Sequence, residues 1–263
     1  MSLTLDHIVI AVHDLEQTIS DYQALGFSVV PGGAHPGRPT HNALVVFADG
    51  AYLELIAWRE PAPDDRWWQQ LQQHGEGIID FALLPTSTAE VIAAAKSRGL
   101  DLQGPLDGGR LRPDGERLLW QTGRPHTQDL PFLCGDITPR SLRVPEGDVR
   151  QHSNGAAGVQ SLSVAVFKLP QSVQRYLALL GPDANITVDT AAQTATITLG
   201  PTQLVLEQAT PDPSAARGTA AHQLGSRGEG AFALSLSRVD SDLAAAQNGL
   251  SHGAVIRQEA ALV

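Results

Sequence analysis

The sequence predicts an α+β protein built from repeated βαβββ modules. Three observations support this fold class: a β-branched strand followed by a capped helix near the N-terminus, a second strand and helix with the same spacing, and three strand-like runs after each helix. Self-similarity at a fixed spacing indicates a repeated structural unit. The repeat therefore predicts how the whole chain is organised.

The first module begins with a strand over residues 7–12, which are rich in β-branched side chains. Asp14 is a typical helix N-cap, and Gly26 stands where a left-handed glycine often follows a helix. The helix between them is followed by three runs that alternate or cluster apolar residues as strands do. These runs cover residues 27–30, 41–47 and 51–57.

The second module repeats these signals. Its strand covers residues 80–84, its N-cap is Ser87 and its closing glycine is Gly99, so that cap and glycine are twelve residues apart, as they are in the first module. The three strands expected after this helix cover residues 109–112, 116–122 and 131–137.

We expect the modules to form two paired units. Modules 1–57 and 78–137 make up a first unit over residues 1–137, and residues 138–158, rich in Pro, Gly, Ser and charge, are expected to be a linker. Residues 159–263 form a second, degenerate unit whose last module is incomplete, because only one further strand fits after its helix. The elements expected there are strands over 161–166, 194–199, 202–208, 231–237 and 254–260, and helices over 170–180 and 240–248.

Composition and charge narrow the functional classes. The chain is 42% hydrophobic and 17% charged, which is typical of globular proteins. A net charge of −10 without a basic run argues against nucleic acid and anionic membranes as partners. A single cysteine, an N-terminus unlike a signal peptide and the lack of an apolar run of about 20 residues predict a cytoplasmic protein.

Four segments resemble the glyoxalase-like branch of the vicinal-oxygen-chelate (glyoxalase/bleomycin resistance/extradiol dioxygenase) superfamily: LDHIVIAVHDL, GGAHPGRPTHNAL, GAYLELIA and RPDGERLLW. The resemblance implies paired modules that form curved mixed sheets around a cleft, with the helices on the convex side. It also implies a divalent metal held by the first and last strands of each module, and isomerase, lyase or dioxygenase chemistry on a small molecule. Other members of the superfamily have no metal and only bind a ligand.

Strand alternation places His7 and Glu54 on the cleft face, because the residues next to them supply the apolar face that packs on the helix. They stand on the strands where the resemblance implies metal ligands, and imidazole with carboxylate suits Zn²⁺, Mn²⁺, Fe²⁺ or Ni²⁺. By register, Asp80 takes the place of His7 in the second module. A metal site of His7, Glu54 and Asp80 is one hypothesis, and no metal at all is the other.

Glu54 is also the candidate catalytic residue, as a general base in a cleft that raises its pKa. The alternative for this pair is structural: a glutamate that hydrogen-bonds a neighbour, and a histidine whose ring nitrogens are satisfied within the fold.

The expected substrate-binding residues are His41, Tyr52, Arg112 and Trp120. A two-residue turn at Asp49-Gly50 would place His41 on the cleft face, on the order of 14 Å along the strand from Glu54. Tyr52 shares the inward parity of Glu54.

In the second module, a three-residue turn would put Arg110, Arg112 and Trp120 on one face. Guanidinium groups beside an indole suit an anionic or planar substrate. The alternative is a solvent-facing basic strand, which we favour for Arg110, whereas for Arg112 and Trp120 we favour a place in the pocket.

These observations predict a small-molecule enzyme acting on an anionic or aromatic metabolite. The alternative is a non-catalytic protein that sequesters a ligand in the same cleft. Ser161 and Val205, at the register of His7 and Glu54, offer no chemistry, so the second unit is expected to brace the first. Because an incomplete last module would expose a strand edge, another segment of the chain or a second subunit of a homodimer should cover it.

Overall fold

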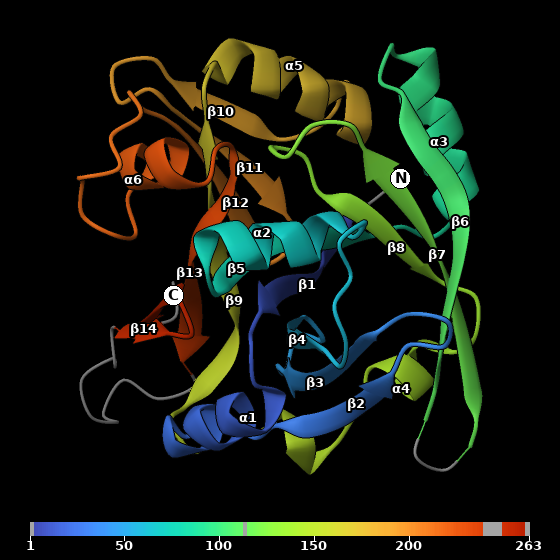
Figure 1. The fold of residues 1–263 in the computed structure, drawn as a ribbon. Coiled ribbons are helices and arrows are strands. Elements are labelled where there is room, and N and C mark those ends of the chain that lie inside the picture. The colour runs from blue at the N-terminus through green and yellow to red at the C-terminus, as the bar shows by residue number, and fades with distance from the viewer. Residues whose placement is uncertain (1–2, 113–114, 239–248, 261–263) are drawn as a thin grey trace.

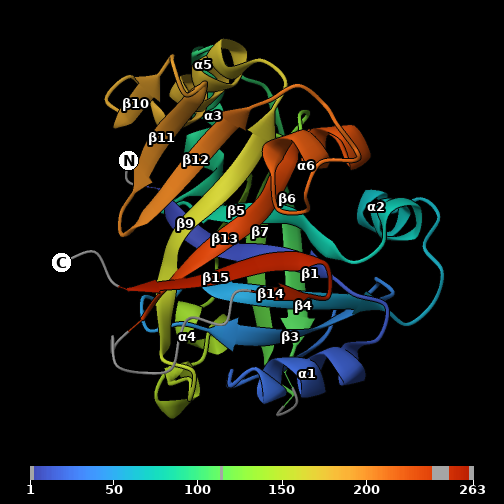
Figure 2. The same cartoon turned by 90° about the vertical axis from the view of Figure 1, so that its left-hand side faces the viewer.

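The computed structural model describes residues 3–112, 115–238 and 249–260. Two curved mixed sheets lie against each other, one from each half of the chain (Figure 1). Strands β13 and β15 of the second sheet pack against β5 of the first (Figure 2). No helix in the described ranges combines the length and apolarity needed to cross a membrane.

The first sheet has eight strands in the order β2-β3-β4-β1-β5-β8-β7-β6. The first strands of its two modules, β1 and β5, pair antiparallel at the centre, and each pairs in parallel with the last strand of its own module, β4 and β8. The strands are β1 (Thr4–Ala11), β2 (Val30–Ala34), β3 (Thr40–Val46), β4 (Tyr52–Trp58), β5 (Gly77–Leu84), β6 (Leu102–Leu111), β7 (Arg117–Pro125) and β8 (Phe132–Asp136).

The helices of both modules begin and end where the sequence predicts. In α1 (Leu15–Ala24) the Asp14 side chain accepts a hydrogen bond from the Gln17 amide, and Gly26 has a φ of +87°. In α3 (Thr88–Ser97) Ser87 accepts from Glu90, and Gly99 has a φ of +85°. Both helices cover the sheet face opposite the cavity described below, which confirms the predicted fold class.

One helix between the modules was not expected. Residues Arg66–His74 form α2, whose N-cap Asp65 accepts from the amides of Trp67 and Trp68. This helix packs on the other face of the sheet, beside β5 and β1, and brings Trp67 to the cavity.

The second sheet has seven strands in the order β10-β11-β12-β9-β13-β15-β14. Its elements are β9 (Ala156–Val166), α5 (Leu169–Leu180), β10 (Ile186–Asp189), β11 (Thr194–Leu199), β12 (Thr202–Gln208), α6 (Ala220–Ser226), β13 (Gly230–Arg238), β14 (Gly249–Ser251) and β15 (Ala254–Ala260). Ser163 pairs with Val205 as Val9 pairs with Glu54, so Ser161 and Val205 do stand at the register of His7 and Glu54.

The last module holds one strand more than expected. Strand β14 precedes β15 and pairs with its first residues, 254–256, so a segment of the same chain covers that part of the edge. The helix expected over residues 240–248 lies outside the described residues.

The core runs through both halves. Ile8, Ile10 and Leu53 of the first sheet and Leu162 and Leu206 of the second are fully buried in one continuous apolar cluster. Burying a side chain of this size contributes about 1.5–3 kcal/mol relative to leaving it exposed.

The β3–β4 hairpin differs in register from the expected one, and this corrects the placement of His41. The turn has three residues, Ala48 to Gly50, closed by a hydrogen bond from the Phe47 amide to the Ala51 carbonyl, and Gly50 has a φ of +84°. Leu44 rather than Val45 therefore lies opposite Glu54. Because a shift of one residue turns every side chain to the other face, Asn42 faces the cavity and His41 faces away from it.

The segment expected to be a linker also folds back on the first sheet. It contains α4 (Arg140–Arg143) and a 3₁₀ turn (Asp148–Arg150). Arg140 and Arg143 both donate hydrogen bonds to Asp6 on β1, so this segment supports the cavity as well as connecting the sheets.

Candidate functional site

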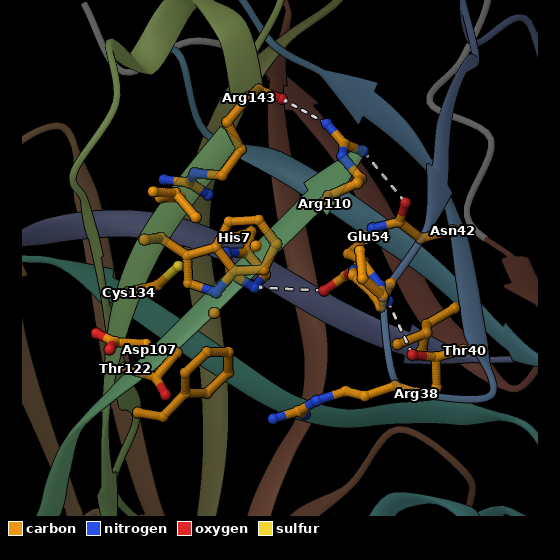
Figure 3. A pocket seen from close by; sticks show the side chains of 18 of the residues that line it. His7, Arg38, Thr40, Asn42, Glu54, Asp107, Arg110, Thr122, Cys134 and Arg143 are labelled. Atoms are coloured by element: carbon orange, nitrogen blue, oxygen red, sulfur yellow. Dashed lines mark hydrogen bonds and ion pairs between the residues drawn. The ribbon is translucent and has the colours of Figure 1, made fainter. Parts of the chain in front are cut away.

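A cavity of about 260 Å³ lies on the concave face of the first sheet (Figure 3). Both modules line it, because β1 and β5 meet at the centre of the sheet. Its polar and aromatic wall includes His7, Asn42, Tyr52, Glu54, Arg110, Trp120, Phe132 and Cys134.

His7 and Glu54 meet in this cavity. The parallel pairing of β1 and β4 places Val9 opposite Glu54 and His7 opposite Tyr52, so the side chains of His7 and Glu54 lie on the same face of the sheet. His7 Nε2 lies 3.4 Å from Glu54 Oε2, and both side chains are less than a tenth exposed. The structure thus brings together the two residues that strand parity placed in one cleft.

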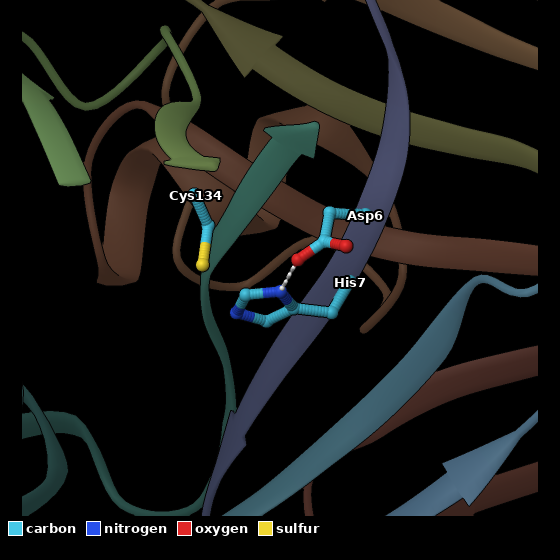
Figure 4. A group of neighbouring side chains, drawn as sticks. All are labelled: Asp6, His7 and Cys134. Atoms are coloured by element: carbon cyan, nitrogen blue, oxygen red, sulfur yellow. Dashed lines mark hydrogen bonds and ion pairs between the residues drawn. The ribbon is translucent and has the colours of Figure 1, made fainter. Parts of the chain in front are cut away.

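Asp6 orients the imidazole of His7. A register shift between Leu5 and His7 interrupts the β1–β5 pairing and lets two consecutive side chains come together. Asp6 Oδ2 lies 2.7 Å from His7 Nδ1 (Figure 4), and the other ring nitrogen, Nε2, is the one that lies near Glu54. A carboxylate behind one ring nitrogen fixes the tautomer and the orientation of a histidine that uses its other nitrogen.

Two arginines form ion pairs with the buried carboxylate of Asp6 and stabilise its charged form. Arg143 NH1 lies 2.8 Å from Asp6 Oδ2, and Arg140 NH1 lies 2.5 Å from Oδ1. Arg143 also donates to Asp136 on β8 and to the hydroxyl of Tyr52. Burial by itself would raise the pKa of Asp6, but Arg143 and the other charged neighbours hold that pKa well below its usual range.

The contact between His7 and Glu54 favours the charged form of both side chains. Burial would lower the pKa of His7, but hydrogen bonds to Asp6 and Glu54 raise it above its usual value. Burial would raise the pKa of Glu54, but His7 outweighs this and lowers it to about 2. The expectation of a cleft that raises the pKa of Glu54 is therefore wrong, because it ignored a cationic partner in contact with the carboxylate.

Asn42 and Arg110 fix the other oxygen of Glu54. Asn42 Nδ2 donates to Glu54 Oε1 at 2.5 Å, and Arg110 NH1 donates to Asn42 Oδ1 at 3.3 Å. Arg110 also donates to the backbone carbonyl of Arg143 and is only 4% exposed. These contacts hold Glu54 with one oxygen toward Asn42 and the other toward His7.

Aromatic side chains enclose His7 and continue to the mouth. The ring of Tyr52 stacks on His7 with centroids 4.7 Å apart, and Phe132 meets the imidazole edge at 5.3 Å. Trp120 lies edge-on to His35, whose Nε2 is 3.9 Å from Glu54 Oε1. Burial lowers the pKa of His35, which favours its neutral form.

The other expected site residues lie apart from this pair. Asp80 is buried on β5 opposite Val9, where it accepts hydrogen bonds from Arg66 and Trp67, and it does not line the cavity. Arg112 is half-buried beyond the cavity, at the turn between β6 and β7. Arg110, for which the solvent-facing place was favoured, is the one that lines the cavity, because its strand position is farther from the turn.

The donor atoms allow two metal sites. Ligand atoms of Asp6, His7 and Cys134 all lie within 4.8 Å of one another, so these three can surround an ion. However, His7 Nδ1 and Asp6 already bond to each other and Asp6 to its arginines, and burial raises the pKa of the Cys134 thiol.

The pair His7 Nε2 and Glu54 Oε2 fits a metal better. With metal–ligand bonds of about 2.0–2.2 Å, two ligands of one ion lie about 3.0–3.5 Å apart. The observed separation of 3.4 Å falls in that range. In this arrangement Asp6 supports the ligating histidine from behind.

Residues 5–180 match the family model described as a glyoxalase-like domain. The chain belongs to this family. The glyoxalase-like protein therefore has the fold that its sequence motifs implied, within the vicinal-oxygen-chelate superfamily. No curated protein matches its sequence.

Solved structures share the fold of this glyoxalase-like protein at low identity. A hypothetical protein from Staphylococcus aureus has a TM-score of 0.74 and 16% identity over 98% of this chain and 99% of its own. A mutant 4-hydroxymandelate synthase from Streptomyces coelicolor has a TM-score of 0.58 and 14% identity over 91% and 72%. A xylose isomerase-like TIM barrel/4-hydroxyphenylpyruvate dioxygenase fusion protein has a TM-score of 0.53 and 17% identity over 90% of this chain and 36% of its own.

Proposed function

We propose that this protein is a metal-dependent enzyme that acts on a small anionic or aromatic metabolite, with isomerase, lyase or dioxygenase chemistry. The observation that carries the proposal is the 3.4 Å separation of His7 Nε2 and Glu54 Oε2 in a cavity, backed by the Asp6 carboxylate. A divalent ion such as Zn²⁺, Mn²⁺, Fe²⁺ or Ni²⁺ would act there as a Lewis acid on a substrate oxygen.

The protein's own groups have separate roles in this proposal. His7 and Glu54 bind the ion, and Asp6 keeps the Nδ1 proton on His7 so that Nε2 is free to bind. Asn42 holds Glu54 in place. Tyr52 and Trp120 contribute aromatic walls that exclude water and accept a planar substrate.

Metal binding tests the proposal directly. Titration of the metal-free protein by calorimetry, with metal content measured by elemental analysis, should give one ion per chain. His7→Ala and Glu54→Ala should each weaken the affinity by about 100-fold or more, since removing a ligand exceeds the 10- to 100-fold of a supporting residue. His41→Ala, on the other face of β3, is the matched control. Unchanged affinity in His7→Ala would contradict the proposed site.

The alternative function is binding without catalysis. It is favoured by the second module, where Asp80 is engaged by Arg66 and Trp67 and its carboxylate is not directed to the cavity. A protein that binds small aromatic acids but no divalent ion, and that leaves them chemically unchanged, would support this alternative. The names of two enzymes that share this fold, a 4-hydroxymandelate synthase and a 4-hydroxyphenylpyruvate dioxygenase fusion protein, suggest aromatic acids as the first compounds to test.

We further propose that the protein is cytoplasmic. Each chain would consist of two paired units, residues 1–137 and 159–263, and two chains would associate as a homodimer. The buried free thiol of Cys134 supports a reducing compartment. The short edge strand β14 supports a contact between second sheets. Light scattering after gel filtration measures the mass, and a monomer at micromolar concentration would contradict the dimer.

A further inference from the structure

Two arginines at the mouth of the cavity make no ion pair with a carboxylate among the residues that the structure describes. Arg38, on the turn between β2 and β3, and Arg124, on β7, both line the cavity and also the groove outside it. Neither guanidinium donates a hydrogen bond or forms an ion pair in the described parts of the chain. The two sides of the mouth therefore each present a free cation.

The two buried arginines of the cavity, Arg110 and Arg143, are already engaged. Arg143 is neutralised by Asp6 and Asp136, and Arg110 is tied to Asn42 and to a backbone carbonyl. Arg110 and Arg143 therefore fix the side chains that surround His7 and Glu54. Arg38 and Arg124 have no such structural task.

The backbone that carries each arginine is held by hydrogen bonds, whereas the Arg38 side chain is exposed. The turn that carries Arg38 is closed by hydrogen bonds from the His35 amide to the Thr40 carbonyl and from the Arg38 amide to the His35 carbonyl. Figure 3 shows the Arg38 side chain extending across the cavity below Glu54, toward the side that carries Thr122. Arg124 follows Thr122 on β7 by two residues and is half-buried.

The acidic groups nearby form no ion pair with Arg38 or Arg124 within the described residues, although the charges of Asp80 and Asp65 act on Arg124 from a distance. Asp65 lines the mouth, but its carboxylate caps α2 by accepting two backbone amides. Asp80 is taken by Arg66 and Trp67. Glu60 and Asp64 line only the outer groove.

We propose that Arg38 and Arg124 form a subsite for the carboxylate of the substrate at the mouth of the cavity. The proposal rests on the proposed function and specifies the substrate class: an aromatic or planar acid whose ring lies against Trp120 and Trp67, with the carboxylate turned outward, away from His7 and Glu54. Arginine binds carboxylate with two parallel hydrogen bonds, so an arginine on each side of the mouth suits an anionic group.

Benzoate and its neutral amide, benzamide, distinguish a carboxylate subsite from simple aromatic binding. Both ligands are titrated into the metal-free protein, with the fluorescence of the cavity tryptophans as the signal. We expect benzoate to bind about tenfold or more tightly than benzamide, since a hydrogen bond to a charged group has that value. Because no metal is present, the result does not depend on whether His7 and Glu54 bind an ion.

Arg38→Gln and Arg124→Gln should each weaken benzoate binding by about tenfold and leave benzamide binding within about twofold. Arg38→Lys, which keeps the charge but loses the planar fork, should retain part of the affinity. Arg217→Gln, which removes a positive charge from the groove beside α6, is the control and should change neither ligand. Equal affinities for the two ligands, no measurable benzoate binding, or benzoate binding that survives both substitutions would overturn the proposal.

Discussion

His7 Nε2 and Glu54 Oε2 lie 3.4 Å apart on neighbouring parallel strands, and both side chains are buried. Without a metal, the proton on His7 and the charge on Glu54 hold the pair together. In the proposed metal-bound state, an ion would take the place of that proton between the same two atoms. Protons and metal ions would then compete for the position between His7 and Glu54, and several measurable effects follow.

Metal affinity should rise with pH. His7 must lose its Nε2 proton before it can bind an ion, and its pKa is raised above the usual value of 6.5. The rise should therefore continue above pH 6.5, with about one proton released per ion. Calorimetry in buffers of different ionisation enthalpy counts the protons. Asp6→Asn should move the rise to lower pH, and a flat pH profile in the wild type would contradict the competition.

The stability of the metal-free protein should fall when acid protonates Glu54. A carboxyl with a lowered folded pKa contributes stability that is complete above its unfolded value of 4.5 and is lost as the pH falls toward about 2. The largest contribution that this shift allows is about 3 kcal/mol. Urea unfolding between pH 6 and pH 2.5 measures it. Glu54→Gln should lose less stability over this range than the wild type, and equal losses would argue against the pairing.

At higher pH, the contribution of His7 to stability should fall as the pH rises. The stabilisation from His7 is complete below pH 6.5, because its folded pKa is raised, and it is lost as the pH rises through that raised value. The free energy of unfolding of the wild type should therefore decline there more than that of His7→Gln.

Arg143→Met should destabilise the protein strongly. Asp6 is fully buried, and removing its main counter-ion leaves a charge in the core, which typically costs about 3–5 kcal/mol. Arg140→Met should cost less, since that side chain is 28% exposed. Thermal and urea unfolding measure both. Adding Asp6→Asn to Arg143→Met should recover part of the loss, and the absence of any recovery would point to packing rather than charge.

His35→Ala and His41→Ala form a matched pair on one hairpin. His35 lines the cavity, 3.9 Å from Glu54, whereas His41 faces the opposite side of β3. Metal affinity should fall by about tenfold in His35→Ala, as for a supporting residue, and remain unchanged in His41→Ala. A loss of metal affinity in His41→Ala but not in His35→Ala would instead support the hairpin register expected from the sequence.

The repeated spacing was sufficient to predict the modules, because each helix is bounded by local signals. Asp14, Gly26, Ser87 and Gly99 act through the backbone atoms next to them, so their effect depends little on the rest of the fold. The inward parity of His7 and Glu54 was predictable for a similar reason, since alternation within a strand requires no knowledge of its partner.

The parts of the site that depend on pairing or on distant residues were not predictable. Asn42 replaces His41 in the cavity because the turn before Gly50 has three residues, and the sequence of that turn is compatible with two lengths. Asp6 reaches His7 only through an irregularity in β1. Arg143 is 137 residues away from Asp6 in the sequence, and it lies in a segment whose composition predicted a linker between the two units.

The position of Arg140 and Arg143 limits where the chain can be divided into two halves. A fragment ending at residue 137 would contain all eight strands of the first sheet, yet it would bury the Asp6 carboxylate without either guanidinium. A fragment that keeps the Asp6 carboxylate paired must therefore extend past residue 143, beyond the last strand of the first sheet and into the segment that joins the two halves.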